Sequence, residues 1–334
     1  AILNAGATYN GMFGGDSLTF TATKAAFSDK NAGTGKTVNV SGIALGGADA
    51  GNYSLASNTA TGTGDIAKAS ITGVSGFAAG TRVYDATTTA TVSNAGATFA
   101  GMVNGDSLNV SATSANFIDK NAGSGKVVNA SGMTLGGTDA GNYNLVSNIS
   151  SGTADITAKA LTLTGQVAGN KVYDGNTLAQ LTGGSLIGLV GGETLTIGGQ
   201  TAAFSDKNAG NAKAVTVSGT TLLDGSGSAS NYTVSNPTGL TASITPKALT
   251  VAGQVAGNKV YDGNALAQLT GGSLVGLVGG ETLTIGGQTA AFSDKNAGNA
   301  KTVTVTGTTL LDTATGLAGN YTVSNPTGLT ASIT

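Results

Sequence analysis

The sequence contains no cysteine, histidine or tryptophan, and only 10% of its 334 residues are charged. The lack of Cys excludes a disulfide scaffold. Together with the lack of His, it also removes the thiolate nucleophile, the commonest general base and the usual zinc ligands. The only two glutamates are Glu193 and Glu281. We therefore expect no enzyme, no catalytic residues and no cofactor-binding residues.

Net charge is −2 and no run of basic residues occurs. The positive stripe that neutralises nucleic-acid phosphates is missing, so no nucleic-acid partner is expected. No apolar run approaches the roughly 20 residues of a membrane-spanning helix, so the chain is not expected to span a membrane. The sequence starts at Ala1 without the charged and apolar regions of a signal peptide, and we expect it to be a segment of a longer protein.

What the chain does have is glycine and strand-forming residues. Gly occurs 55 times, hydrophobic residues make up 40% of the chain, and only 3 Pro are present. The hydrophobic content excludes a disordered chain, and the abundance of Thr, Ser and Val favours many short strands joined by tight turns.

A repeat organises the sequence. The motif Phe-Ser-Asp-Lys-Asn-Ala-Gly occurs four times, with Ile118 replacing the serine in the second copy, and each copy precedes an Asn-Tyr pair by a similar distance. The motif begins at Phe27, Phe117, Phe204 and Phe292, and the paired tyrosines are Tyr53, Tyr143, Tyr232 and Tyr321. The period of about 88 residues is the size of a domain and exceeds that of solenoid repeats. We predict four units: 1–67, which is incomplete, 68–157, 158–245 and 246–334.

The third unit shows the strand pattern most clearly. Apolar and polar residues alternate in several short segments, as in half-buried strands. These segments are Ala160–Thr164, Thr194–Ile197, Ala214–Ser218, Tyr232–Val234 and Leu240–Ile244, and the predicted core residues are Leu163, Leu195, Ile197, Val215 and Val217. The pattern predicts an all-β fold, a tandem array of immunoglobulin-like antiparallel β-sandwiches. A mixed sheet with one small helix between Gly184 and Gly191 is the alternative. Because the connections between units are about three residues long, we expect a semi-rigid array.

Polar residues of the seven-residue motif are the main site candidates. Calcium takes carboxylate and amide oxygens, and each copy supplies an Asp with an Asn two residues later. The candidate calcium ligands are Asp29, Asn31, Asp119, Asn121, Asp206, Asn208, Asp294 and Asn296, with Asp49 and Asp139 as further donors. The intervening Lys places a like charge beside a cation, and no Asp-x-Asp-x-Asp-Gly loop occurs. We therefore favour an Asx turn and keep calcium as the alternative.

Two covalent chemistries are also conceivable. Ser205 and Lys207 could form a Ser-Lys pair, but the pair lacks a surrounding motif and recurs in series, so catalysis is not expected. An intramolecular isopeptide bond needs a Lys, an acid and an Asn together, and Lys171, Asp174 and Asn208 are residues of those types. The isopeptide bond stays open as the weaker alternative. Measurement of the intact mass tests it, because each bond would remove one ammonia.

A Val-Tyr-Asp motif begins at Val83, Val172 and Val260 but is absent from the first unit, which therefore lacks its opening strands. We expect the tyrosine ring of this motif to pack in the core and its hydroxyl to bond to a loop. The aspartate, followed by Gly175 or Gly263, predicts a turn at the end of a strand.

Taken together, these motifs resemble the YDG repeat of long filamentous-haemagglutinin-like adhesins of Gram-negative bacteria. In the third unit the matching segments are Lys171–Asn176, Gly191–Thr194, Phe204–Gly210, Asn231–Tyr232 and Ile244–Lys247. The second unit departs from the pattern only by Arg82 and Ala86, which replace Lys and Gly. The resemblance implies a protein secreted by a two-partner type of route to the extracellular face of the bacterial cell surface, where the repeats form a stalk.

The resemblance also implies partners: other domains of the same adhesin, and a host or matrix ligand bound elsewhere. We expect a stalk that projects a distal binding region and supports adhesion or biofilm formation. The alternative is a self-assembling extracellular fibre, in which neighbouring copies pair through strand edges or donated strands. A carbohydrate-binding module is disfavoured because few aromatic residues remain once the cores are built.

Overall fold

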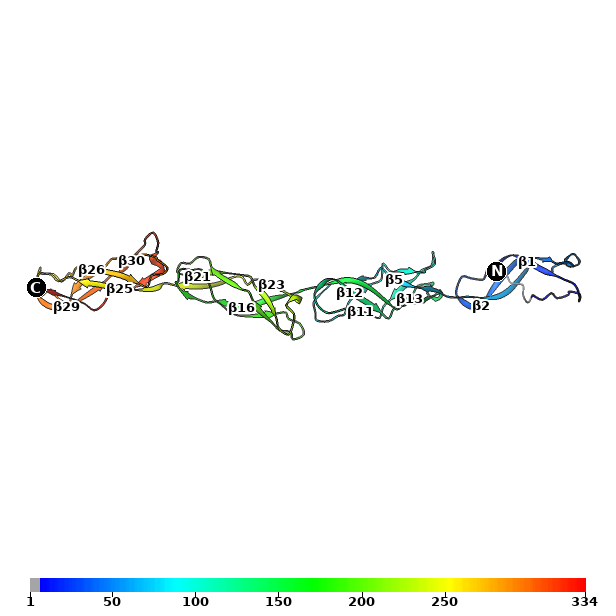
Figure 1. Ribbon diagram of the computed structural model, residues 1–334, viewed down its shortest axis with the longest axis horizontal. Helices are drawn as coiled ribbons and strands as arrows, with labels where there is room; N and C mark the ends of the chain where they lie inside the picture. The colour runs from blue at the N-terminus through cyan, green and yellow to red at the C-terminus, as the bar shows by residue number, and fades with distance from the viewer. Residues whose placement is uncertain (1–6) are drawn as a thin grey trace. The chain divides into compact units, whose positions relative to one another are not determined.

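The computed structural model describes residues 7–334, so residues 1–6 of the first predicted unit lie outside the described part. The chain divides into two compact units, Ala1–Thr157 and Ala158–Thr334. Each unit holds two of the repeats, which we number 1 to 4 from the N-terminus (Figure 1). The all-β prediction is confirmed, and among residues 7–334 the only helical segments are four 3₁₀ turns of three residues.

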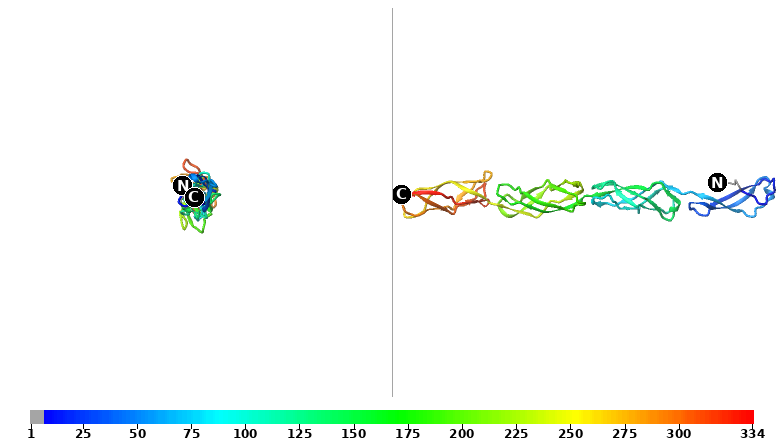
Figure 2. Two further views of the ribbon diagram at one scale, coloured as in Figure 1. Left: turned by 90° about the vertical axis from the view of Figure 1, so that its right-hand side faces the viewer. Right: turned by 90° about the horizontal axis from the view of Figure 1, so that it is seen from below.

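Repeat 3 has two main sheets and one small one. The sheet orders are β18-β16-β23, β17-β24-β21-β20 and β19-β22. The elements are β16 Lys159–Ala168, β17 Lys171–Val172, β18 Leu181–Ile187, β19 Leu195–Gly198, β20 Thr201–Phe204, β21 Gly210–Ser218, β22 Thr221–Asp224, η3 Ala229–Asn231, β23 Tyr232–Val234 and β24 Leu240–Thr245. The strands run along the length of the repeat, so the chain enters at one pole and leaves at the other (Figure 2).

The core of repeat 3 follows from the alternation in β21. Val215 and Val217 are buried and Thr216 is exposed, as the period of a strand requires. The valines pack with Phe204 and with partly buried Leu181 from the facing sheet. Burial of such side chains contributes about 1.5–3 kcal/mol each. The predicted core residues Leu163, Leu195 and Ile197 are only half-buried.

Repeat 4 copies this arrangement, with sheets β26-β25-β31, β28-β29-β32 and β27-β30. Its elements are β25 Lys247–Ala256, β26 Leu269–Val275, β27 Thr284–Gly286, β28 Thr289–Phe292, β29 Gly298–Thr306, β30 Thr309–Leu311, η4 Ala318–Asn320, β31 Tyr321–Val323 and β32 Leu329–Ile333. A second core cluster, which includes Phe292 and Val303, fills its C-terminal half.

Repeat 2 is built from shorter strands, with one sheet of order β11-β12-β15-β7 and four two-stranded pairs. Its elements are β4 Ala69–Ile71, β5 Gly73–Ser75, β6 Ala78–Ala79, β7 Arg82–Val83, β8 Val92–Ser93, β9 Thr98–Ala100, β10 Asn109–Ser111, β11 Ser114–Phe117, β12 Gly123–Ser131, β13 Thr134–Gly136, η2 Ala140–Asn142, β14 Tyr143–Leu145 and β15 Ile149–Thr157.

Repeat 1 consists of a single described sheet of order β1-β2-β3, formed by β1 Thr19–Phe27, β2 Gly33–Gly46 and β3 Thr59–Ile66, with the 3₁₀ turn η1 Ala50–Asn52. None of its described residues is fully buried. Phe27 is 40% exposed, whereas the equivalent Phe204 is 3% exposed. Among the described residues of repeat 1, no second sheet packs on Phe27.

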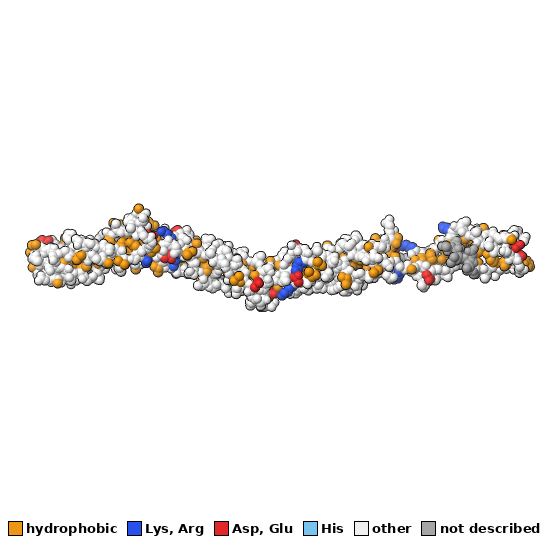
Figure 3. Space-filling view, in the orientation of Figure 1, with side chains coloured by type: hydrophobic (Ala, Val, Ile, Leu, Met, Phe, Trp, Pro, Cys, Tyr) orange, Lys and Arg blue, Asp and Glu red, His pale blue; other side chains and the backbone are white. Residues whose placement is uncertain are grey.

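Four further findings bear on the predictions. The helix considered between Gly184 and Gly191 is wrong, because that segment begins inside strand β18 and contains no helix. Short parallel pairs, such as β17 with β24, accompany the predicted antiparallel ones. Among the described residues, no helix has the length and apolar character that crossing a bilayer requires. Most of the visible surface is uncharged, and the charged side chains form small groups (Figure 3).

Candidate functional site

Each Asn-Tyr pair ties its tyrosine to an acid of the same repeat. Tyr143 donates its hydroxyl hydrogen bond to Asp106 at 2.6 Å, and Tyr321 donates to Glu281 at 2.7 Å. The corresponding pairs in repeats 1 and 3 are Tyr53 with Asp16 and Tyr232 with Glu193. The tyrosine oxygen in turn accepts a backbone N–H, from Val278 in repeat 4. One acid is therefore fixed at the N-terminal pole of every repeat.

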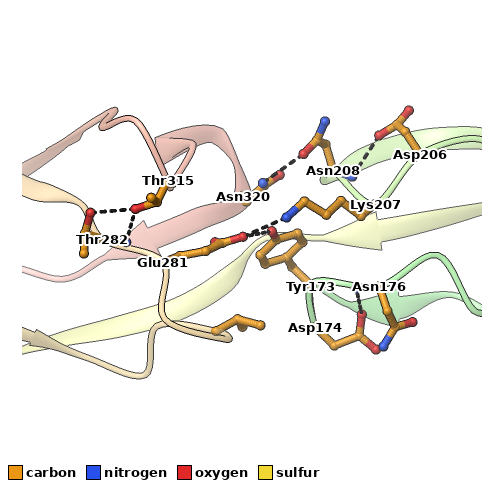
Figure 4. Close-up of polar contacts among 12 residues, drawn as sticks. Tyr173, Asp174, Asn176, Asp206, Lys207, Asn208, Glu281, Thr282, Thr315 and Asn320 are labelled. Atoms are coloured by element: carbon orange, nitrogen blue, oxygen red, sulfur yellow. Dashed lines mark hydrogen bonds and ion pairs between the residues drawn. The ribbon is translucent and has the colours of Figure 1, made fainter.

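In repeat 4 this acid also contacts repeat 3, and we call the contact between the two repeats the 3–4 joint. Its residues in repeat 3 are Tyr173, Lys207, Asn208 and Ala209, and its residues in repeat 4 are Val278, Glu281, Asn320 and Tyr321. Figure 4 shows Lys207 and Tyr173 pointing toward Glu281. The Tyr173 hydroxyl donates to Glu281 Oε1 at 2.6 Å, and Lys207 Nζ lies 3.0 Å from the same oxygen. Two tyrosines and one lysine therefore converge on a single carboxylate.

An asparagine pair adds to the polar contacts of the 3–4 joint (Figure 4). The Asn320 side chain accepts the backbone N–H of Ala209 at 2.7 Å and donates to Asn208 Oδ1 at 3.1 Å. Asn320 is 3% exposed. A buried amide that lost these partners would leave unsatisfied polar groups at a cost of about 1–3 kcal/mol.

Apolar packing continues across the 3–4 joint. Tyr173 is 1% exposed, and its ring meets that of Tyr321 edge-on with centroids 5.3 Å apart. One core cluster contains Tyr173 and Phe204 of repeat 3 together with Leu249 and Tyr321 of repeat 4. Repeats 3 and 4 therefore share a continuous hydrophobic core.

The electrostatics of the 3–4 joint follow from this geometry. Burial works to raise the pKa of Glu281, but the hydrogen bonds from Tyr173, Tyr321 and Lys207 outweigh it and hold that pKa below its ordinary value. Burial and the hydrogen bond to Glu281 raise the pKa of Tyr321 to about 12. The ionised acid beside neutral tyrosines is thus the stable arrangement at neutral pH.

The 1–2 joint, formed by Lys30, Asn31 and Ala32 against Asp106, Asp139 and Asn142, uses the same elements with two aspartates. Lys30 Nζ lies 2.5 Å from Asp106 and 2.8 Å from Asp139. Hydrogen bonds to these two acids raise the pKa of Lys30. The Asn142 side chain accepts the Ala32 N–H at 2.8 Å and donates to Asn31 at 3.2 Å. In both joints, therefore, the acid and the asparagine of one repeat bind the Lys-Asn-Ala segment of the preceding repeat.

The Val-Tyr-Asp segment is held by its own lysine. Lys171 Nζ contacts Asp174 and Asn176 and lies 5.5 Å from the centre of the Phe204 ring. Arg82 makes the equivalent contact with Phe117 at 5.4 Å. The predicted turn is present, because Asp174 accepts the backbone N–H of Asn176 and the loop follows Tyr173 directly.

The aspartates proposed as calcium ligands form Asx turns. Asp206 Oδ1 accepts the Asn208 N–H at 2.8 Å and lies 2.7 Å from Lys213 Nζ. The same two contacts recur in the other repeats, pairing Asp29 with Asn31 and Lys36, Asp119 with Asn121 and Lys126, and Asp294 with Asn296 and Lys301. The lysine hydrogen bond and the turn lower the pKa of Asp206. Among residues 7–334, no group of three or more His, Cys, Asp or Glu is placed to hold a metal ion, and calcium binding stays an untested alternative.

The other candidates are only partly brought together. Lys171 and Asp174 form an ion pair, but the Asn208 side chain accepts from Asn320 instead of approaching Lys171. Lys207, considered with Ser205 as a Ser-Lys pair, is paired with Glu281.

The sequence reasoning missed the joint acids and the asparagine of the Asn-Tyr pair. The available signal was a Gly-Asp or Gly-Glu at one fixed place in every repeat, at Asp16, Asp106, Glu193 and Glu281.

The comparisons with known proteins agree with this internal repetition. The family model of the YDG domain matches four segments of the chain, residues 1–60, 67–151, 157–239 and 245–328. No curated protein and no solved structure matches the chain. Each match covers most of one of the four repeats.

Proposed function

Because the chain belongs to the YDG domain family in four tandem copies, we propose that it is a structural stalk segment of a secreted bacterial surface adhesin. The stalk projects a distal binding region from the outer face of the cell and supports adhesion or biofilm formation. Its partners are the other domains of the same adhesin. It performs no catalysis and uses no cofactor.

The observation that carries the proposal is the 3–4 joint. A stalk must resist bending where its domains meet, and flexible linkers do not provide that resistance. Here only Pro246 separates β24 from β25, and the two repeats share a core that contains Tyr173 and Leu249. An apolar and polar contact of this kind favours one orientation of repeat 4 on repeat 3.

Spin-label distance measurements across the 3–4 joint test the proposal. The chain has no Cys, so Thr216→Cys and Thr304→Cys, both on exposed strand faces, give a clean label pair. We expect one narrow distance distribution, and a broader one after Tyr173→Ala. A broad distribution in the otherwise unmodified chain would refute a stiff stalk.

A second candidate is a self-assembling extracellular fibre. The observation that favours it is the edge strands of the described sheets, such as β18 in the order β18-β16-β23 and β20 in the order β17-β24-β21-β20. Exposed edges recruit strands from other chains. Sedimentation velocity over a range of concentrations separates the two functions: a constant monomer supports the stalk, and growing filaments support the fibre.

A further inference from the structure

Repeats 3 and 4 each carry a groove beside their first long strand. In repeat 3 the groove measures about 410 Å³ and lies between β16 and the segment that joins β23 to β24. In repeat 4 it measures about 450 Å³ and lies at the same place, between β25 and the segment that joins β31 to β32. The lining of the first groove includes Leu163, Gln166, Ser235, Asn236 and Pro237, and the equivalent residues line the second. All residues that line either groove are uncharged.

One edge of β16 has no partner strand along the groove. β18 pairs with the opposite edge from Thr162 to Ala168, and β23 pairs with the groove edge only at Lys159–Leu161. Among the described strands, none continues the pairing of β23 along this edge. In repeat 4, β31 likewise pairs with β25 only at Lys247–Leu249. The wall of each groove therefore offers backbone N–H and C=O groups to an added strand.

A proline and a glycine open the groove. Pro237 lacks an N–H and has a fixed φ, and Gly239 adopts φ 75°, so that β24 begins only at Leu240. In repeat 2, the same Ser-Asn pair is followed by Ile149, and β15 begins at this residue, which stands opposite Ser131. Repeat 3 therefore has a loop where repeat 2 has the start of a strand, and repeat 4 has the same Asn-Pro-Thr-Gly sequence.

Repeat 2 shows what lies in the equivalent place. Its Ile71 is the counterpart of Leu161, because each is the last residue of its strand to pair with the strand after the 3₁₀ turn. The backbone N–H of Val146 donates to Ile71 O at 3.0 Å, and the Ser150 hydroxyl donates to Val74 O at 2.7 Å. Within repeat 3, all of which the structure describes, no hydrogen bond joins residues 235–239 to β16. The grooves therefore lie where repeat 2 holds an uncharged stretch of its own chain.

We propose that each groove binds an extended, uncharged segment of a partner polypeptide, which takes the place beside β16 or β25 that follows the end of β23 or β31. The backbone of the segment pairs with the free strand edge, and its apolar side chains cover Leu163 or Val251. A charged side chain in the groove would lose water without gaining an ionic partner, so an uncharged segment is favoured. The site is independent of whether the chain acts as a stalk or as a fibre.

A peptide copied from repeat 2 tests the site on the complete 334-residue chain. The probe is residues 144–151, Asn-Leu-Val-Ser-Asn-Ile-Ser-Ser, with both ends blocked so that it carries no charge. Fluorescence anisotropy of a labelled form measures Kd, and hydrogen exchange locates the peptide. At roughly ten times Kd, we expect exchange in residues 162–167 and 250–255 to slow by about tenfold.

A second probe tests whether the backbone of the peptide is used. It carries Ser147→Pro and Asn148→Pro, which remove two successive N–H groups. Because successive N–H groups point to opposite sides of a strand, one of the two faces the groove edge in either register. This probe should bind about fivefold more weakly or worse. Equal binding of the two probes would overturn the proposal.

A graft from repeat 2 supplies a matched variant of the chain. The combined change Pro237→Ile, Thr238→Ser and Gly239→Ser gives repeat 3 the sequence of repeat 2 and should extend β24 and close its groove. The slowing caused by the peptide should then be lost at residues 162–167 and kept at 250–255, where repeat 4 shows that the chain is folded. Thr238→Trp, which places a bulky side chain at the groove wall, should have the same effect.

Three outcomes would overturn the proposal. The first is slowing at residues 162–167 that persists in both repeat 3 variants. The second is slowing confined to other residues, such as the edge strands β18 and β20. The third is no binding at about 1 mM peptide.

Discussion

Replacing Tyr173 should loosen the 3–4 joint far more than replacing the identical Tyr261 affects repeat 4. Both tyrosines stand in a Lys-Val-Tyr-Asp-Gly segment, but Tyr173 is 1% exposed and Tyr261 is 52% exposed. Truncating a buried aromatic side chain to Ala destabilises by about 3–5 kcal/mol. At Tyr261 the same change should cost about 1 kcal/mol or less, because about half of the residue is already exposed to solvent. Tyr261→Ala is therefore a matched control.

Removing only the hydroxyl of Tyr173 separates the contribution of the hydrogen bond from that of the buried ring. Tyr173→Phe keeps the ring and its contact with Tyr321 but removes the hydrogen bond to Glu281. A hydrogen bond to a charged acceptor contributes about 1.5–3 kcal/mol, and Lys207 remains to pair with the carboxylate. We expect a loss of about 1–2 kcal/mol.

Hydrogen exchange measured by mass spectrometry follows both effects at the joint itself. Because about 1.4 kcal/mol corresponds to a factor of ten, Tyr173→Phe should accelerate exchange in residues 277–283 and 206–210 roughly tenfold. Tyr173→Ala should accelerate it by about 100-fold or more. Equal acceleration by the Tyr173 and Tyr261 variants would show that burial in the joint is not what holds the repeats together.

Three further predictions concern the turn after the tyrosine and the acid of the joint. Ala86 occupies the left-handed region with φ 66°, so Ala86→Gly should raise the free energy of unfolding of repeat 2 by about 1 kcal/mol in chemical denaturation. Gly175→Ala should destabilise more than Gly263→Ala, because its Cβ would lie only 2.8 Å from Val278. The depressed pKa of Glu281 means that its stabilisation is present above its ordinary pKa of 4.5 and is lost as pH falls through the folded value. Hydrogen exchange at the 3–4 joint, measured as a function of pH, should therefore show loss of protection below about pH 4.5. The Glu281→Gln variant should lack this pH dependence.

The local structure of each repeat was largely predictable because it depends on short-range patterns. Alternation in Ala214–Ser218 places Val215 and Val217 inside, and the structure confirms both. Leu195 and Ile197 alternate equally well but are half-buried, because β19 pairs only with β22 in a small two-stranded sheet. A hydrophobic pattern predicts which face of a strand points toward the core. It does not predict how completely the rest of the repeat covers that face.

The joints were not predictable from the same patterns. Lys207 and Glu281 are 74 residues apart and belong to different repeats, so no local spacing relates them. The prediction for Tyr173 was correct in kind, since the ring is buried and the hydroxyl is bonded to a loop. The loop, however, belongs to the next repeat. Recurrence of a residue shows that every repeat contains it, but not that it contacts a neighbouring repeat.

Each repeat carries different motifs for the two sides of a joint. The Lys-Asn-Ala segment and the Val-Tyr-Asp turn lie at the C-terminal pole of repeat 3, and the acid and the Asn-Tyr pair lie at the N-terminal pole of repeat 4. A repeat that carries both halves can join a copy on either side. Duplication of such a repeat therefore adds length and the residues of a packed joint in one step. Loss of Tyr173 should leave a cavity in the 3–4 joint, around which the lysine and asparagine contacts remain.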